Sequence, residues 1–317
     1  MLAHWQIRLL LLALFLLRSL SAADDTRSAL PTYHSTVSEV RVTFFATDQN
    51  NRPLEIVSTS DFAIVDNEQV VRNFRSFMHS DETSLNIVAL VDLSESVAPR
   101  FRVAISDVLQ LVAREQSISD DDISVLSFGG DPGGRPGGAS NTLRPAVLCS
   151  SGCRAHDSMS RLLAVKSSGT TPLFDALIFG ADFIALHQRP GERPVLILFS
   201  DGNDTISLHS ANDALQAVME TGALIYTVDM GTSADPTSGS TFLRQVSDAT
   251  GGRYFSLRDG AATVLNAVLA DLRASYVVTY DLPSYQAGFH ALRFYPTRNL
   301  HLTFDSRDGY YYEPSSR

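Results

Sequence analysis

The chain has 317 residues and a formal net charge of −10 at pH 7, from 35 acidic and 25 basic side chains. This acidic balance lacks the positive surface that DNA and RNA binding require, so no nucleic-acid partner is expected. The length is sufficient for one large domain, or for one domain with smaller appendages.

The first 23 residues have the layout of a secretory signal peptide. Arg8 precedes an apolar block at residues 9–17, and small side chains follow at residues 21–23. This block is shorter than the roughly 20 apolar residues that a membrane-spanning helix needs, and no later segment is long and apolar enough to span. An uncleaved N-terminal anchor is the alternative. We therefore expect an exported protein, periplasmic or extracellular, without a stable membrane span after removal of the signal.

Residues 36–80 are expected to form an N-terminal β segment. Residues 37–47 alternate apolar and polar side chains, and residues 48–53 predict a turn. Residues 62–74 then predict two strands on either side of Asp66. The segment alone lacks a convincing core, so its strands need partners from elsewhere in the chain.

Residues 85–274 are predicted to form one domain of the α/β class, because apolar runs of strand length alternate with stretches of helical period. Strands are predicted at residues 86–92, 123–128, 194–200, 223–229 and 253–256. Helices are predicted at residues 98–115, 154–165, 172–187, 210–220, 240–249 and 261–273. The alternation indicates a doubly wound, mainly parallel sheet covered by helices on both faces, a Rossmann-like arrangement. Such a sheet binds its ligand beyond the carboxyl ends of its strands, where the strand order reverses.

The only two cysteines, Cys149 and Cys153, enclose the flexible sequence Ser-Ser-Gly. In an exported chain a pair at this spacing predicts a small disulfide loop. Two free thiols are the alternative. A zinc site would need further Cys or His ligands, and only His156 lies nearby in the sequence.

Residues 275–313 are expected to form a C-terminal β segment. Strand patterns lie at residues 275–283, 289–297, 300–306 and 309–314. Because neither end of the chain has a core of its own, we expect the two β segments to pack together or onto the α/β domain.

Five oxygen-bearing side chains follow predicted strand ends or precede a predicted helix. Asp92, Ser94 and Ser96 leave the first strand of the α/β domain at alternate positions, which point to the same side. Asp201 follows another strand, and Thr171 directly precedes a helix. Each has a structural alternative, since Ser96 and Thr171 could be helix N-caps and Asp201 could belong to a simple turn. Their joint occurrence at the strand ends of one domain favours a common site.

This pattern resembles the von Willebrand factor type A domain, whose metal-ion-dependent adhesion site (MIDAS) is written Asp-x-Ser-x-Ser, then Thr, then Asp. The matching positions are Asp92, Ser94, Ser96, Thr171 and Asp201. The flanking strand patterns are similar to the bacterial von Willebrand factor A-related acidobacterial domain family. The resemblance implies the strand order 3-2-1-4-5-6, which sets the strands ending in Asp92 and Asp201 side by side. It also implies that the three hydroxyls contact a metal ion, Thr171 in a high-affinity state, while the two carboxylates act largely through water.

Hydroxyl and carboxylate oxygens are hard donors suited to Mg²⁺, with Mn²⁺ or Ca²⁺ as alternatives. Direct ligands without charge leave the cation free to accept a carboxylate from a protein partner. We therefore expect an exported, metal-dependent binding module of the adhesion type that recruits an acidic group of a protein partner. A structural envelope subunit with a stabilising ion is the first alternative.

Enzymatic activity is not expected. The sequence contains neither the Gly-x-Ser-x-Gly pattern of serine hydrolases nor the His-Glu-x-x-His pattern of zinc proteases. Asp92 and Asp201 could hold a catalytic water on a metal ion, which leaves a metal-dependent hydrolase as the second alternative. Hydroxyl ligands are poor ones for such an enzyme.

Overall fold

The computed structural model describes residues 39–50, 52–80, 83–114, 122–129, 145–259 and 261–314. The expected signal peptide, residues 1–23, lies outside these ranges. Among the helices within them, none combines the length and the apolar character needed to cross a membrane.

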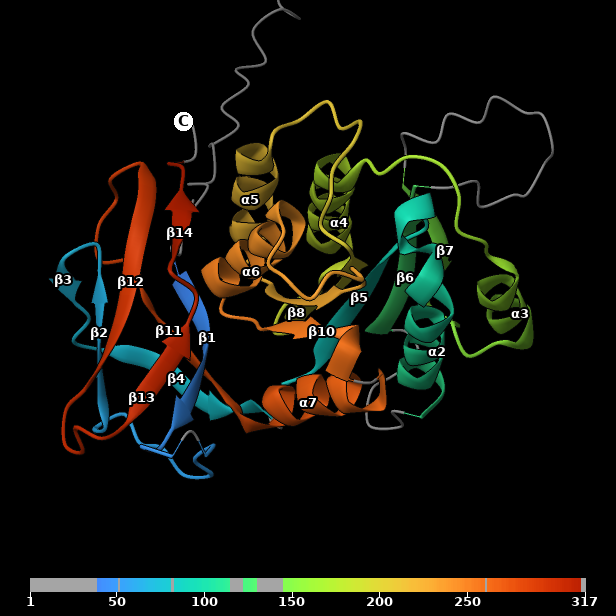
Figure 1. Ribbon diagram of the computed structural model, residues 1–317. Helices are drawn as coiled ribbons and strands as arrows, with labels where there is room; N and C mark the ends of the chain where they lie inside the picture. Colours follow the sequence, from blue (N-terminus) through green and yellow to red (C-terminus); the bar gives the residue numbers. More distant parts are fainter. Residues whose placement is uncertain are drawn as a thin grey trace, which may run out of the picture. The chain divides into compact units, whose positions relative to one another are not determined.

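A six-stranded sheet forms the core of the α/β domain (Figure 1). In spatial order its strands are β10 (Tyr254–Ser256), β9 (Leu224–Asp229), β8 (Arg193–Ser200), β5 (Leu85–Asp92), β6 (Ile123–Phe128) and β7 (Ala146–Ser150). The strands from β10 to β6 pair in parallel, and β7 joins β6 antiparallel at the edge. Counted along the chain the order is 3-2-1-4-5-6, so the winding reverses between β5 and β8. The predicted fold class, a doubly wound and mainly parallel α/β sheet, is confirmed.

Helices cover both faces of this sheet. Alternate residues of each strand point to opposite faces, and because the residues on both faces are apolar, both faces are buried by helices. The helices are α2 (Ala98–Arg114), α3 (His156–Ala164), α4 (Leu173–His187), α5 (Ala211–Glu220), α6 (Ser238–Thr250) and α7 (Ala261–Ala274). On β5, Ile87, Ala89 and Val91 share a buried cluster with residues of α2, α3 and α7. Val88 and Leu90 belong to a second cluster, with residues of α4, α5 and α6. Every residue of β6, β8 and β9 is buried, which explains their continuous rather than alternating apolar character.

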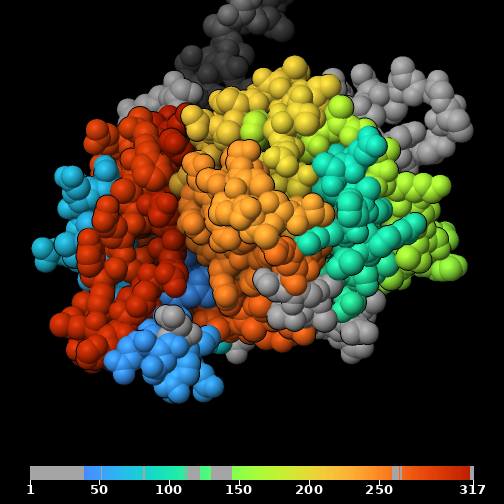
Figure 2. Space-filling model, in the orientation of Figure 1, coloured from blue at the N-terminus to red at the C-terminus, as the bar shows by residue number. Residues whose placement is uncertain are grey.

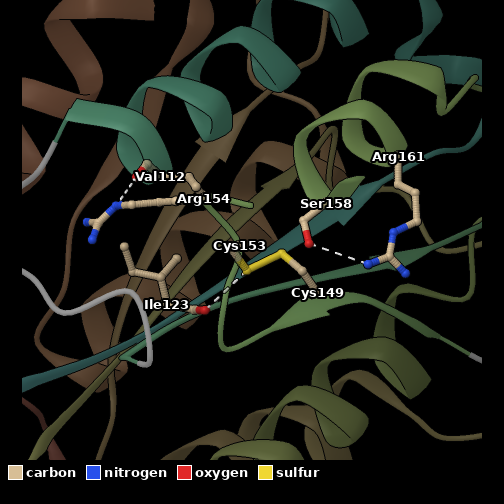
Figure 3. Close-up of a disulfide and its surroundings, with 7 residues drawn as sticks. All are labelled: Val112, Ile123, Cys149, Cys153, Arg154, Ser158 and Arg161. Carbon is tan, nitrogen blue, oxygen red and sulfur yellow. Dashed lines mark hydrogen bonds between the residues drawn. A yellow bond between two sulfur atoms is a disulfide. The ribbon is translucent and has the colours of Figure 1, made fainter. Parts of the chain in front are cut away.

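Strand β7 was not predicted from the sequence. It lies at the sheet edge, and Cys149 is its one buried residue, so it lacks the apolar run of the inner strands. Cys149 forms a disulfide with Cys153, which lies in the turn before α3 (Figure 3). The Cys153 sulfur is 3.3 Å from the Ile123 carbonyl oxygen of β6. The disulfide therefore ties the edge strand to the turn that follows it, beside β6.

The two ends of the described chain form two four-stranded antiparallel sheets that share one core. One sheet has the order β13 (Thr303–Ser306), β1 (Glu39–Thr47), β11 (Ser275–Asp281), β4 (Phe74–His79). The other has the order β14 (Gly309–Tyr312), β12 (Gly288–Pro296), β2 (Phe62–Asp66), β3 (Gln69–Val70). The Phe44 ring of β1 lies 5.0 Å from the Phe62 ring of β2 and 4.7 Å from the Phe294 ring of β12, measured between centroids. Strands from both ends of the chain therefore contribute to one aromatic core, here called the sandwich.

A buried arginine connects the α/β domain to the sandwich. Arg193, the first residue of β8, donates to the Ser275 hydroxyl at 2.6 Å and to the carbonyl oxygens of Ser80 and Leu272 at 3.2 and 3.3 Å. Ser275 begins β11 immediately after the last residue of α7, so these contacts join the end of that helix to the sandwich. Burial lowers the pKa of Arg193 to about 10, and the side chain stays charged at neutral pH. This set of contacts is called the arginine joint below.

A second buried arginine belongs to the sandwich and contacts the α/β domain. Arg307, between β13 and β14, donates to the carbonyl oxygens of Gly309 and of Met219 near the end of α5. Burial lowers its pKa to about 10 as well. The carbonyl end of a helix carries partial negative charge, which helps to stabilise a buried guanidinium.

Candidate metal site

Three loop segments meet at the carboxyl ends of β5 and β8 and carry the five predicted site residues; they are residues 92–97, 168–172 and 201–207. A backbone hydrogen bond from Ser168 N to the Leu93 carbonyl, at 2.6 Å, joins the first segment to the second. Another from Thr205 N to the Thr171 carbonyl, at 2.9 Å, joins the second to the third. The site predicted from separate parts of the sequence thus lies on loops that contact one another at the reversal point of the sheet.

Asp92 is completely buried at the end of β5. One carboxylate oxygen accepts a hydrogen bond from Ser94 N at 2.8 Å, and the other accepts one from the Ser200 hydroxyl at 2.7 Å. Burial raises the pKa of Asp92 to about 6, and the nearby charge of Asp201 acts in the same direction. The hydrogen bonds oppose this rise, and they fix the carboxylate in one orientation.

Ser94 and Ser96 place their hydroxyl oxygens side by side. The two Oγ atoms lie 3.1 Å apart, with Ser94 buried and Ser96 exposed. Ligands at right angles around Mg²⁺ lie about 2.9 Å apart, because its metal–oxygen distances are about 2.0–2.1 Å. The separation is therefore compatible with two neighbouring ligands of one small cation, and equally with a hydrogen bond between the hydroxyls.

Thr171 is not the N-cap of the helix that follows it. The N-cap position of α4 is Pro172, and the first helical N–H groups, of Leu173 and Phe174, donate to Oδ1 of Asp204 at 2.8 and 3.3 Å. Thr171 is buried, and its backbone N–H donates to the Thr205 hydroxyl at 2.8 Å. The helix thus has a cap that leaves the Thr171 hydroxyl available for another contact.

Asp201 takes part in a turn, as its structural alternative predicted. Its Oδ1 accepts a hydrogen bond from Asn203 N at 3.0 Å. The following Gly202 has φ 78°, and a side chain there would lie 2.2 Å from the Gly239 carbonyl in the first turn of α6. The backbone at Asp201 and Gly202 therefore packs closely against the first turn of α6, while the Asp201 carboxylate bonds to its own turn.

Two residues at the site were not identified from the sequence. Ser200, the last residue of β8, orients Asp92 and also accepts a hydrogen bond from Gly202 N at 3.1 Å. Gly129 follows β6 with φ 66°, and an added Cβ would lie 2.7 Å from the Thr170 carbonyl and 3.2 Å from Ser94 N. Ser200 could have been identified because it is a hydroxyl residue that ends a wholly buried strand, directly before Asp201. A glycine directly after a neighbouring strand was the signal for the second.

The donor set fits a hard divalent cation. Among the residues that the structure describes, no Lys or Arg side chain forms an ion pair with Asp92 or Asp201. Buried carboxylates without a positive partner are unfavourable, and a bound cation would compensate for their charge. The same described residues contain no group of three or more His, Cys, Asp or Glu placed to hold a metal. A cation at this edge would therefore depend on the serine and threonine hydroxyls as well as on the acids.

Comparison with known proteins gives a family match to the central part of the chain. The model of the von Willebrand factor type A domain matches residues 86–268, more than half of the 317 residues. No curated protein matches the chain. The matched range begins in β5 and ends in α7, so it contains all five site residues.

Solved structures of several proteins are similar to the chain at low sequence identity. A von Willebrand factor type A structure from Catenulispora acidiphila is 12% identical with a TM-score of 0.42, over 88% of this chain and 75% of its own. Manganese-loaded TRAP protein from Plasmodium vivax is 13% identical with a TM-score of 0.42, over 79% of this chain and 99% of its own. Proximal thread matrix protein 1 from the mussel byssus, with a zinc-occupied MIDAS motif, is 15% identical with a TM-score of 0.44, over 61% of this chain and 48% of its own. The family assignment comes from the match to residues 86–268.

Proposed function

The chain belongs to the von Willebrand factor type A domain family, and we propose that it is an exported binding module that recruits a protein partner through a divalent metal ion. Ser94, Ser96 and Thr171 would hold the ion directly, while Asp92 and Asp201 would hold it largely through water. The bound ion would supply one open position to a carboxylate of the partner. An acidic side chain from the partner would then complete the coordination.

The arrangement of charge around Asp92 is the observation that carries this proposal. Asp92 is completely buried, Asp201 is 6% exposed, and neither has a basic partner among the described side chains. Ser96, by contrast, is exposed beside the buried Ser94. A cation held here would be anchored by buried groups below and would be accessible from solvent on the Ser96 side.

Mg²⁺ is the proposed ion. The donors are hard oxygen atoms, which favour Mg²⁺, Mn²⁺ or Ca²⁺ over soft metals. The 3.1 Å separation of the serine oxygens is compatible with two neighbouring ligands of a small octahedral ion.

Export is supported by the disulfide between Cys149 and Cys153. Structural disulfides persist mainly in oxidising compartments such as the periplasm and the extracellular space. A carboxylate-bearing protein is the partner that suits both this location and a solvent-accessible cation.

The site is proposed as a binding site and not as a catalytic one, because three of its five donors are neutral hydroxyls. Screening with ester, peptide and phosphoester substrates checks this point. Metal-dependent turnover that disappears in Thr171→Ala would contradict it.

Partner capture tests the function. The purified chain is immobilised and exposed to the native extracellular fraction in Mg²⁺ or in EDTA, alongside Thr171→Ala and the matched surface variant Thr241→Ala. We expect wild type and Thr241→Ala to retain the same protein in Mg²⁺. This protein should be absent when EDTA is present or when Thr171→Ala is used. Retention of the same proteins under all four conditions would contradict metal-dependent recruitment. A large fall in thermal midpoint in EDTA would instead favour a structural ion.

A further inference from the structure

A short loop beside the candidate metal site exposes two aliphatic side chains. The loop follows Asp201 and leads from β8 to α5, and it carries Ile206 and Leu208, which are 40% and 84% exposed. Figure 2 shows the yellow segment that follows β8 at the surface of the molecule. We call these two side chains the apolar rim.

The backbone beneath the apolar rim is held by two carboxylates. Asp175, in the first turn of α4, accepts hydrogen bonds from Leu208 N at 3.0 Å, from His209 N at 3.1 Å and from the His209 ring at 2.8 Å. Asp204 accepts one from Ser207 N at 3.2 Å while it also caps α4. The loop's polar groups therefore bond to the protein, and the two aliphatic side chains are left facing solvent.

The rim is adjacent to the metal site through covalent and hydrogen-bonded links. Thr205 and Thr171 are joined by three hydrogen bonds, at 2.8, 2.9 and 3.4 Å. Ile206 is the next residue, so its Cα lies about 3.8 Å from that of Thr205. Leu208 is fixed to Asp175, only four positions beyond Thr171. A peptide whose acidic side chain reached the cation would place its neighbouring residues over this loop.

The rigid, exposed aliphatic pair suggests which partner fits. A loop already fixed in position loses little conformational freedom on binding, so burying its apolar side chains contributes directly to affinity. Resting on the function proposed above, we infer that the apolar rim selects protein segments in which the metal-binding acid has aliphatic neighbours. The carboxylate complements the cation and the aliphatic side chains complement Ile206 and Leu208, so one short segment of a partner would occupy both surfaces.

Three short peptides test this selectivity. Acetyl-Leu-Glu-Leu-amide carries the acid with aliphatic neighbours, acetyl-Gly-Glu-Gly-amide carries the acid alone, and acetyl-Leu-Gln-Leu-amide carries the neighbours alone. Binding to the full chain is measured in Mg²⁺ by calorimetry. We expect the Leu-Glu-Leu peptide to bind about fivefold to tenfold more tightly than Gly-Glu-Gly, as burial of part of a leucine side chain predicts, and the Gln peptide to bind least.

Two variants assign the difference to the rim. In the double variant Ile206→Ser and Leu208→Ser the two Glu peptides should bind equally, while Mg²⁺ affinity and the thermal midpoint stay unchanged because both side chains are exposed. Leu186→Ser is the matched control, since Leu186 is 81% exposed near the far end of α4, and it should retain the full difference.

The outcomes separate this inference from the function on which it rests. Equal binding of both Glu peptides to wild type, with the Gln peptide weaker, would overturn the rim's role and leave metal-dependent recruitment standing. A preference that persists in the double variant would also overturn it. No advantage of either Glu peptide over the Gln peptide would overturn both.

Discussion

Charged side chains are buried at both ends of the parallel strands of the central sheet, here called the carboxyl edge and the amino edge, but in opposite surroundings. At the carboxyl edge Asp92 and Asp201 have no basic partner among the described residues, and Ser96 beside them is exposed. At the amino edge Arg193 is buried, and its charge faces the Leu272 and Ser80 carbonyls and the Ser275 hydroxyl. One edge lacks a counter-charge that a cation could provide. At the other, oxygen atoms of the protein accept hydrogen bonds from both terminal nitrogens of Arg193, while its Nε has no partner among the described residues, and these contacts join two parts of the fold.

The largest expected effect comes from breaking the arginine joint. Arg193→Met would leave the Ser275 hydroxyl and two carbonyl groups without their charged donor. We expect unfolding free energy to fall by about 2–4 kcal/mol, measured by urea denaturation, because three hydrogen bonds from a charged donor are lost together. Mg²⁺ affinity should stay within about twofold, since the joint lies at the opposite edge from the site.

The control for the joint is Arg52→Met, which removes an arginine that is 73% exposed and paired with Asp48. Its effect on the unfolding free energy should be much smaller, because exposed ion pairs contribute little to stability. If Arg193→Met were as mild as this control, the joint would not hold the two parts together.

Asp92→Asn, at the carboxyl edge, should impair Mg²⁺ binding without lowering stability, which is the reverse of Arg193→Met. Without metal we expect no loss of stability, because the variant removes a buried charge while keeping an acceptor for one of the two hydrogen bonds. With Mg²⁺ at about one hundred times its dissociation constant, wild type should gain about 2.7 kcal/mol and the variant should gain nothing. Thermal denaturation with and without Mg²⁺ measures both. An equal gain in the variant would remove Asp92 from the site.

Gly129→Ala and Gly152→Ala separate backbone strain from crowding at the site. Both glycines have φ 66°, but an added Cβ meets the Thr170 carbonyl at 2.7 Å in the first and nothing within 4 Å in the second. Gly152→Ala should therefore lose about 1 kcal/mol through strain alone. Gly129→Ala should lose about 1 kcal/mol more and should also weaken Mg²⁺ binding, because it displaces the loops that carry Ser94 and Thr171. Equal stability and equal Mg²⁺ affinity in the two variants would contradict this packing.

Asp107 on α2 is another buried acidic residue, outside the metal site and the arginine joint. Burial raises its pKa to about 6, and its carboxylate oxygens have no hydrogen-bond partner among the described residues. Because the folded-state pKa lies above the unfolded value, folding is favoured while Asp107 is protonated. Stability is lost as pH rises from about 4 through about 6. Asp107→Asn should thus match wild type near pH 4 and exceed it by about 1–2 kcal/mol at pH 8, in urea denaturation at both values. A constant difference across this range would exclude the titration.

Local patterns in the sequence predict the fold well where each strand has a simple environment. The continuous apolar runs of β6, β8 and β9 and the alternation of β1 follow directly from burial on two faces or on one. β7 escaped prediction because an edge strand of five residues with one buried side chain has neither pattern. Its position depends on pairing with β6, which is a contact between separate segments.

The residues of the candidate site form a pattern that is visible in the sequence, whereas the contacts that support them do not. The spacing of Asp92, Ser94 and Ser96 is local and visible, whereas the hydrogen bond from Ser200 joins residues 108 positions apart. Asp204 similarly caps α4 from another loop, 31 positions away. Such contacts depend on the order of strands in space. Arg193 could not be recognised for the same reason, since its three acceptors come from β11, α7 and the residue after β4.

A calorimetric Mg²⁺ titration of wild type and Ser96→Ala tests the central claim most directly. Ser96 is exposed and bonds only to the Ser94 hydroxyl among the described contacts, so its truncation should alter the site with little effect on the fold. Ser160→Ala, another exposed serine in a helix, is the control. We predict one Mg²⁺ per chain for wild type and Ser160→Ala, and at least tenfold weaker binding for Ser96→Ala. Unchanged affinity in Ser96→Ala, or no Mg²⁺ binding by wild type at millimolar concentration, would contradict a metal ion held between these loops.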